Sequence, residues 1–403
     1  MSWLKEKLGK VLTIERGGSP RPIDKYLTNS PEGVNWIKIS DATASDKYIF
    51  ETKEKIKKEG LHKTRMVNEG DFILSNSMSF GRPYIMKTTG CIHDGWLVLK
   101  QNGEKVFDTE FLYYLLSSPY VFNQFNYLAA GSTVRNLNIA LVSSVEVPIP
   151  PLPEQQRIVA LLDEAFAAIT KAKANAEQNL KNAKELFGSY LQGVFENKGE
   201  GWEEKTLAQI SKTFGRGKSK HRPRNWNGLY GGNYPFIQTG DIRNCNHYIT
   251  EYSQTYNDVG LAQSKLWKAG TICITIAANI AETGVLTFDA CFPDSVIGIE
   301  VNEIYADRDF VEYLLQSFKV RIQALGKGSA QANINLGTFE NELFPFPTVA
   351  QQKSIVEKLN QLSAESNKLE ATYLKKLADL EELKKSILQK AFAGELTDKS
   401  ISS

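Results

Sequence analysis

The chain has 403 residues, too many for one ordinary hydrophobic core, so its length predicts two to three domains. Hydrophobic residues make up 42% and aromatic residues 10%, which is typical of a folded protein. No run approaches the roughly 18 apolar residues of a membrane helix, and no signal peptide is expected. The four cysteines include no C-x-x-C pair, so neither a disulfide framework nor a zinc ribbon is expected, and a reducing cytoplasm is the default compartment. Because the net charge is only +2, a nucleic-acid partner would require locally concentrated basic charge.

The sequence is a tandem repeat whose offset is close to half its length. Residues 36–41, Trp-Ile-Lys-Ile-Ser-Asp, recur 200 positions later as Phe-Ile-Gln-Thr-Gly-Asp at 236–241. Further matches at the same offset are Tyr48-Ile49 with Tyr248-Ile249, Cys91 with Cys291 and Asp94 with Asp294. Chance matches would not keep their order and spacing over such a length. The chain is therefore predicted to contain two diverged copies of one unit.

Each copy begins with a globular part. Residues 1–150 and 199–347 contain short β-branched and aromatic runs bounded by Gly, Asn and Pro. This pattern predicts two mixed α/β domains, and hence an α+β fold. The proline-rich stretch 148–153 ends the first domain, because proline continues neither a strand nor a helix.

Each copy ends with a long helix. Residues 151–198 and 348–396 are rich in strong helix formers, and a tail follows at 397–403. Apolar residues recur there at steps of three and four, which predicts a heptad seam that only Ser366 and Lys384 interrupt. The residues expected to pair the helices are Ile158, Leu162, Ile169, Leu180, Phe187, Ile355, Leu359, Leu369, Leu377, Leu380 and Ile387. Each stripe needs a partner, so an antiparallel coiled coil of the two helices is predicted; the alternative is that each helix lies on its own domain.

A search for catalytic motifs predicts none. Gly217-Lys218-Ser219 resembles the end of a phosphate-binding loop, but Lys212 occupies the position of its first glycine. No Gly-x-Ser-x-Gly motif is present. Cys245-Asn246-His247 has no further metal ligands at matching spacing. Neither catalytic residues nor a metal site is therefore expected, and the chain is predicted not to be an enzyme.

The sequence gives stronger support to nucleic-acid binding, for which basic and amide side chains are the candidates. The stretch from Thr206 to Gly240 contains six Lys or Arg residues and no acid, with glycines and aromatic residues between them. Such a loop suits phosphate contacts, with arginine available for guanine edges; the alternative is a solvated loop of like charge. The mixed run Lys53–Glu59 is expected to be a solvated face. The candidate DNA-binding residues are Arg16, Ser19, Arg21, Asn76, Arg82, Arg216, Lys218, Lys220, Arg222, Arg224, Gln238, Arg243 and Asn279.

Two divergent globular domains alternating with two similar long helices resemble the specificity subunit of type I restriction–modification systems. Residues 148–159, Pro-Ile-Pro-Pro-Leu-Pro-Glu-Gln-Gln-Arg-Ile-Val, are similar to the start of a characteristic helix in that family. The second copy, at 345–356, keeps the Gln and the Ile-Val but has Gln351 in place of the acid. The resemblance covers essentially the whole chain.

The resemblance implies a sequence-specific DNA adaptor without chemistry of its own. Each domain would read one half of a bipartite, asymmetric site in double-stranded DNA, while the helices set the spacer and dock two methyltransferase subunits. Restriction subunits would join in the full complex. This chain would bind no cofactor; S-adenosylmethionine would belong to the methyltransferase subunits, and ATP and Mg to the restriction subunits. The alternative is a non-enzymatic coiled-coil scaffold whose domains bind protein.

Overall fold

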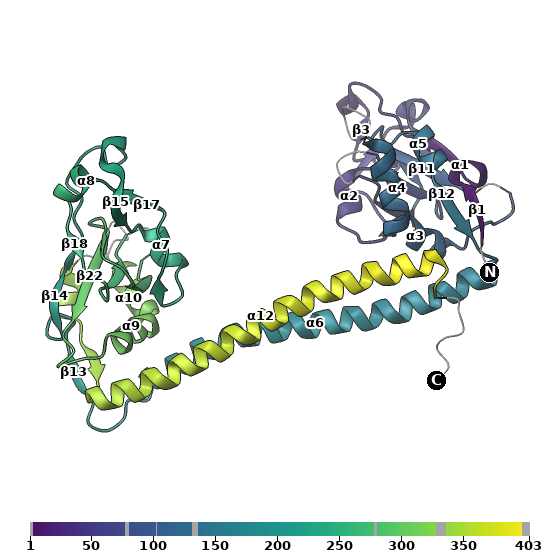
Figure 1. Cartoon of the computed structure of the whole chain (residues 1–403). Helices are drawn as coiled ribbons and strands as arrows, with labels where there is room; N and C mark the ends of the chain where they lie inside the picture. Colours follow the sequence, from purple (N-terminus) through teal and green to yellow (C-terminus); the bar gives the residue numbers. More distant parts are fainter. Residues whose placement is uncertain are drawn as a thin grey trace, which may run out of the picture. The chain divides into compact units, whose positions relative to one another are not determined.

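The computed structural model describes residues 3–76, 80–101, 103–130, 136–277, 280–327 and 336–396. The chain divides into two compact units. One is built from Met1–Glu177 and Lys375–Ser403, and the other from Gln178–Leu374. Because both boundaries fall inside long helices, each unit contains one globular domain and one end of each long helix (Figure 1).

The first domain contains two five-stranded sheets and a two-stranded ribbon. The strands of one sheet, in spatial order, are β2 (Thr13–Arg16), β11 (Trp96–Lys100), β8 (Phe72–Ser75), β9 (Pro83–Met86) and β5 (Tyr48–Ile49). Those of the other are β3 (Leu27–Thr28), β6 (Glu54–Ile56), β4 (Val34–Ile37), β10 (Gly90–Ile92) and β7 (Arg65–Val67). The ribbon pairs β1 (Leu4–Lys7) with β12 (Glu146–Ile149). The helices are α1 (Leu8–Val11), α2 (Ile39–Thr43), α3 (Thr109–Ser117), α4 (Pro119–Ala129) and α5 (Ile139–Ser144), with 3₁₀ turns at Ile23–Lys25 and Lys58–Lys63.

The second domain has a five-stranded sheet, a four-stranded sheet and a ribbon. The five strands, in spatial order, are β14 (Ser211–Arg216), β22 (Val296–Val301), β19 (Ile272–Thr275), β20 (Thr283–Leu286) and β16 (Tyr248–Ile249). The four strands are β17 (Gln254–Tyr256), β15 (Tyr230–Phe236), β21 (Ala290–Cys291) and β18 (Leu266–Trp267), and the ribbon joins β13 (Glu203–Lys205) to β23 (Phe344–Phe346). The helices are α7 (Thr239–Asn244), α8 (Asp258–Ala262), α9 (Arg308–Ser317), α10 (Lys319–Lys327) and α11 (Leu336–Glu340), with a 3₁₀ turn at Asn227–Leu229.

The two domains repeat one topology. The order β2-β11-β8-β9-β5 of the first matches β14-β22-β19-β20-β16 of the second, and β6-β4-β10-β7 matches β17-β15-β21-β18. The registers match as well, since Tyr48 lies opposite Ile85 and Tyr248 opposite Val285 in parallel pairs. The predicted mixed α/β domains in tandem are therefore confirmed.

The two predicted long helices are α6 (Leu152–Glu196) and α12 (Val349–Ala393). Within the first unit they run antiparallel. The amine of Lys173 lies 2.7 Å from the carboxylate of Glu381, and the amine of Lys384 lies 5.3 Å from the ring centre of Phe166. Within the second unit, the buried Ser366 hydroxyl donates a hydrogen bond of 2.6 Å to the carbonyl of Ala183. Both interruptions of the heptad seam thus have a partner on the other helix.

The ends of the long helices also complete the cores of the globular domains. In the first unit, Phe392 of α12 packs on Phe111 of α3, with ring centres 5.4 Å apart. In the second unit, Phe195 of α6 packs on Phe310 of α9 at 5.3 Å. The helices therefore both pair with each other and lie on domains, so the two alternatives drawn from the sequence are combined.

Seam residues are more buried where the long helices pack on a globular domain than where they pack only on each other. Ile158, Leu162 and Leu359, near the domains, are 0% exposed, whereas Leu369 is 40% exposed. The partly buried seam residues are Ile169, Leu180, Phe187, Ile355, Leu377, Leu380 and Ile387. Among the residues described, no helix has the length and apolar character needed to cross a membrane.

Candidate nucleic-acid interface

Four of the candidate residues in the first domain gather around Asp94. The Ser19 hydroxyl donates to Asp94 Oδ1 at 2.7 Å, and the Arg21 guanidinium lies 3.6 Å from Oδ2. Arg16 Nε and Asn76 Nδ2 donate to the Asp94 carbonyl oxygen at 3.0 and 2.9 Å. The hydrogen bond from Ser19 is the main reason why the pKa of Asp94 lies below its usual value. Asp94 therefore fixes the loop and leaves the side chain of Arg21, 80% exposed, at the surface.

Asp294 has the same place in the second domain. Arg224 forms a charged hydrogen bond with its carboxylate, the Arg222 guanidinium lies 3.8 Å from it, and Arg216 Nε donates to its carbonyl oxygen at 2.7 Å. Arg222 also donates to the carbonyl of Ser219 at 2.7 Å. The stretch from Thr206 to Gly240 contains no acid of its own, but the fold supplies one from 70 residues further along the chain.

The remaining candidates lie apart from these two aspartates. Lys218 and Lys220 are exposed and form no ion pair within the described part of the chain. Arg243 is exposed in the last turn of α7. Arg82 lies 3.4 Å from Asp46, with its guanidinium 5.3 Å from the ring centre of Tyr84. Asn279 lies outside the described residues.

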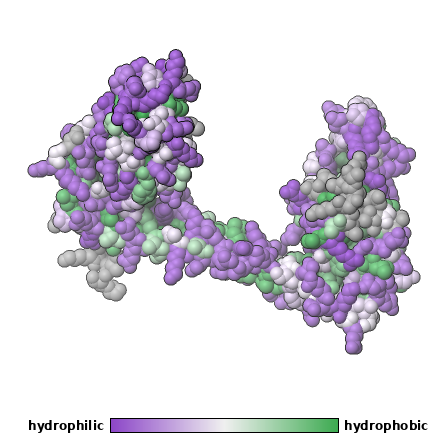
Figure 2. Space-filling view, turned by 180° about the vertical axis from the view of Figure 1, so that it is seen from behind, coloured by the Kyte–Doolittle hydropathy of each residue, from purple (hydrophilic) through white to green (hydrophobic). Residues whose placement is uncertain are grey.

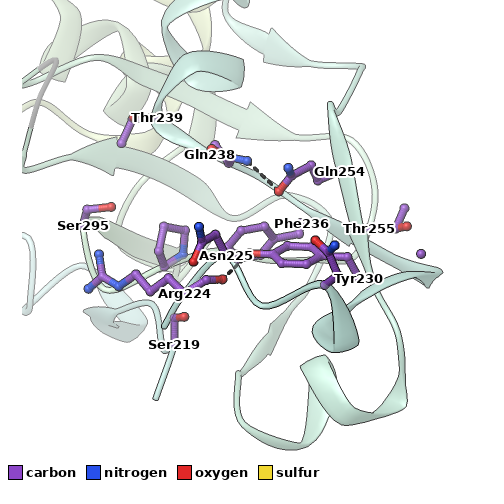
Figure 3. Close-up of a pocket in the computed structure, with 13 residues that line it drawn as sticks. Ser219, Arg224, Asn225, Tyr230, Phe236, Gln238, Thr239, Gln254, Thr255 and Ser295 are labelled. Atoms are coloured by element: carbon purple, nitrogen blue, oxygen red, sulfur yellow. Dashed lines mark hydrogen bonds between the residues drawn. The ribbon is translucent and has the colours of Figure 1, made fainter. Parts of the chain in front are cut away.

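A pocket of about 630 Å³ adjoins the Asp294 cluster (Figure 3). Its aromatic wall comes from Tyr230 and Phe236, whose ring centres are 6.1 Å apart. Gln238 Nε2 donates to Gln254 Oε1 at 2.7 Å, and Figure 3 shows this amide pair on one side of the aromatic rings, with Arg224 on the other. The remaining lining residues are Ser219, Asn225, Asn227, Gly231, Thr239, Thr255, Pro293 and Ser295. The two rings are inclined at 66° to each other, so the pocket places aromatic ring surface beside amide groups.

A pocket of about 760 Å³ lies at the matching place in the first domain. It is lined by Ser19, Pro20, Arg21, Pro22, Ile23, Asp24, Trp36, Lys38 and His93. The amine of Lys38 forms an ion pair with the carboxylate of Glu54. Burial holds the pKa of His93 below its usual value, so the ring is neutral at neutral pH and the cations of this pocket are Arg21 and Lys38.

Sequence reasoning missed most of these pocket residues. It included Ser19, Arg21, Arg224 and Gln238. It did not include Gln254 or Lys38, nor Glu54, which pairs with Lys38 from outside the pocket lining. The repeat contained the signal, because positions 38 and 54 align with 238 and 254 at the 200-residue offset. The same offset pairs Asp94 with Asp294, whose organising role becomes visible only when distant residues are brought together.

In the second domain, a buried ion cluster joins His247, the residue before β16, to two carboxylates of α9. His247 Nδ1 is 2.5 Å from Glu312 Oε2, and Nε2 is 3.5 Å from Asp309 Oδ1. The ring stacks on Tyr313 with ring centres 4.4 Å apart. Burial alone would lower the pKa of His247, but the two carboxylates outweigh it and raise the pKa to about 9. The sequence showed only that Cys245-Asn246-His247 lacks further metal ligands at matching spacing, whereas the structure pairs His247 with two carboxylates in the core.

The chain belongs to the family described as the type I restriction modification DNA specificity domain, whose model matches residues 2–179 and 199–379. The two matches follow the two copies of the repeat. Because this family supplies DNA specificity rather than catalysis, the expectation that the chain is not an enzyme agrees with its family.

Individual relatives and solved structures agree with this family. A Methanocaldococcus jannaschii protein described as the MjaX specificity subunit is 26% identical over 419 residues, covering 99% of this chain and 94% of the relative. The EcoBI specificity subunit of Escherichia coli is 23% identical, covering 98% of this chain and 86% of the relative. A chain from a structure of a type I restriction–modification assembly has a TM-score of 0.76 at 20% identity, with 98% of both chains covered. The HsdS subunit of Thermoanaerobacter tengcongensis has a TM-score of 0.66 at 20% identity, with 98% and 97% covered.

Proposed function

We propose that each globular domain reads one half of a bipartite, asymmetric DNA site. The two long helices set the separation of the halves and dock methyltransferase subunits. The observation that carries this proposal is the duplication of one surface. An aspartate, Asp94 or Asp294, holds arginines beside a pocket in both domains. A repeated surface of arginines beside a pocket is suited to two half-sites of one ligand that differ in sequence.

The candidate residues take two roles in this proposal. The exposed cations contact phosphates: Arg21, Arg82, Lys218, Lys220, Arg222, Arg224 and Arg243. Gln238, in the pocket, reaches a base edge. Arg16, Ser19, Asn76 and Arg216 position the aspartates and, through them, the loops. Asn279 is also proposed to contact DNA from its place in the repeat.

Exposed apolar residues on the long helices support a docking role. In the second unit these are Leu186, Tyr190, Leu369 and Leu374, which are 40–54% exposed; in the first, Leu383 is 47% exposed. Figure 2 shows hydrophobic residues among hydrophilic ones on the surface of the long helices. We assign them to two methyltransferase subunits that bind S-adenosylmethionine. Restriction subunits that bind ATP and Mg would complete the complex, in the cytoplasm.

The basic loop can be tested by salt dependence. The test uses a complex of this chain with its methyltransferase subunits, in which Lys218 and Lys220 are replaced by alanine. The magnitude of the slope of log K against log salt should fall by about 1.8, because a chain that makes two fewer phosphate contacts releases fewer counterions when it binds DNA. Affinity should fall equally for all DNA sequences. Fluorescence anisotropy across a KCl series measures both quantities.

The matched control removes Lys53 and Lys58, two exposed lysines of the expected solvated face. This variant should keep the wild-type slope. If the Lys218 and Lys220 variant also keeps it, the loop does not contact phosphates.

The spacing role can be tested by shortening the helices. Deleting residues 170–176 and 375–381 together removes one heptad from each helix at facing positions, as the Lys173–Glu381 pair indicates. The seam stays in phase, and the helices shorten by about 10 Å at 1.5 Å per residue. The spacer between the half-sites should therefore shorten by about three base pairs at 3.4 Å each. Methylome sequencing reads the spacer directly.

Deleting the heptad from α6 alone is the control, because it misaligns the seam and should lower the midpoint of thermal unfolding. A doubly shortened chain that methylates sites with the wild-type spacer would rule out the spacing role.

A further inference from the structure

The two pockets have the same framework. Trp36 at the end of β4 and Phe236 at the end of β15 are 3% and 5% exposed. Trp36 lies opposite Glu54 in the β4–β6 pair, and Phe236 lies opposite Gln254 in the β15–β17 pair, so the registers are identical.

The next positions along the chain also match. The backbone N–H of Lys38 donates to the carboxylate of Asp41 at 2.9 Å, and that of Gln238 donates to Asp241 at 2.8 Å. The backbone thus presents residues 38 and 238 in the same way, and at these two positions the sites differ in their side chains.

One facing pair of side chains changes its chemistry within this constant framework. In the first domain the pair is an amine and a carboxylate, Lys38 with Glu54, whose side chains are 40% and 36% exposed. In the second domain the pair consists of two amides, Gln238 and Gln254, joined at 2.7 Å. In the free chain the two side chains of each pair bind each other. A ligand that offers matching donors and acceptors can replace these contacts.

We propose that these two pairs determine base specificity, and that the two domains read different base pairs with them. This inference rests on the proposed function. Lysine donates to O6 and N7 of guanine and a carboxylate accepts from the amino group of cytosine, so Lys38 and Glu54 read a G·C pair. A glutamine amide accepts from N6 and donates to N7 of adenine, so Gln238 and Gln254 read an A·T pair.

The experiment exchanges the pairs. Complexes with methyltransferase subunits are prepared with wild-type chain, with Gln238→Lys and Gln254→Glu, and with Lys38→Gln and Glu54→Gln. Binding is measured on a DNA library in which each half-site position is varied in turn. In the first variant one position of one half-site should change its preference from A·T to G·C, by about 5- to 150-fold in relative affinity. In the second, one position of the other half-site should change from G·C to A·T.

Two further variants keep the result interpretable. Gln238→Ala with Gln254→Ala should lose preference at the same single position, even if the exchanged pair fits poorly. Lys268→Gln with Asp289→Asn removes an exposed ion pair of 2.8 Å in the same domain and should leave every preference unchanged. Thermal unfolding of each chain shows whether it is folded.

The inference is overturned if the exchange variants and the alanine variant are folded and keep all wild-type base preferences. It is also overturned if preference falls equally at every position of the half-site, because the pair would then only support the fold. If the wild-type complex itself shows no sequence preference, the proposed function fails instead, whatever the variants do.

Discussion

Replacing Gln155 by leucine is expected to lower the free energy of unfolding of the first unit by on the order of 4 kcal/mol. Gln155 is 0% exposed, and its Oε1 accepts the backbone N–H of Asp108 at 2.7 Å. Its Nε2 donates to the carbonyls of Val106 and Pro150, both at 2.9 Å. Leucine would fill the space but leave three backbone groups without this partner, and each buried unpaired group costs about 1–3 kcal/mol.

The effect should be large because Asp108 is itself the cap of α3, accepting from the backbone N–H of Glu110 at 2.9 Å. One glutamine thereby joins the start of α6 to the start of α3. Gln352 does the same in the second unit, accepting from Asp307 at 2.7 Å and donating to Pro347 at 2.8 Å. With one bond fewer, its replacement by leucine should cost about 3 kcal/mol.

Urea unfolding measures these changes. The neighbouring Gln156 is exposed, so Gln156→Leu is the control and should unfold at nearly the wild-type urea concentration. A Gln155→Leu chain that unfolds together with this control would show that the three hydrogen bonds contribute little.

Raising the pH from 6 to 10 should destabilise the second unit by about 3 kcal/mol through His247. The pKa of His247 is raised from 6.5 to about 9, so its stabilising contribution is fully present below pH 6.5 and is lost as the pH rises through 9. Burial would raise the pKa of Asp309, but His247 and Arg308 hold it below its usual value. The contribution of this carboxylate is therefore lost only in acid, outside the window. Burial raises the pKa values of Tyr248 and Tyr313, so these phenols lose their protons at higher pH than free tyrosine does.

Unfolding midpoints between pH 6 and 10 test this expectation. His247→Gln should be less stable already at pH 6, because it leaves the buried Glu312 without its cation, and its stability should fall much less as the pH rises. His221→Gln changes a histidine outside the cluster and should keep the wild-type pH profile. A His247→Gln chain whose stability falls as steeply as wild type would assign the pH dependence to other groups.

The large features of this fold could be predicted because their signals are local or periodic. The heptad steps predict α6 and α12, and the 200-residue offset predicts the duplication. The seam interruptions at Ser366 and Lys384 could not be explained in the same way. A serine hydroxyl on Ala183 and an amine over Phe166 are contacts between residues about 200 positions apart.

The candidate site was harder to predict for the same physical reason. Basic residues are visible as a run in the sequence, but the aspartate that organises them is contributed by a loop 70 residues away in the second domain. Gln155 belongs to a motif that is recognisable in the sequence. The motif does not indicate, however, that the Gln155 amide accepts the backbone N–H of Asp108 at the start of α3. Charge composition predicts that a ligand could bind, whereas only strand register brings Lys38 to Glu54 and Gln238 to Gln254.

The packing of Phe392 on Phe111 has a consequence for synthesis of the chain. Leu388, Ala391 and Phe392 belong to the same core as the sheet of the first domain, although they lie at the far end of the sequence. Domains usually fold in the order in which they leave the ribosome. Here the first unit cannot complete its core until the last helix has been made, after the whole second unit has emerged. The domain that is synthesised first is therefore the one that is finished last.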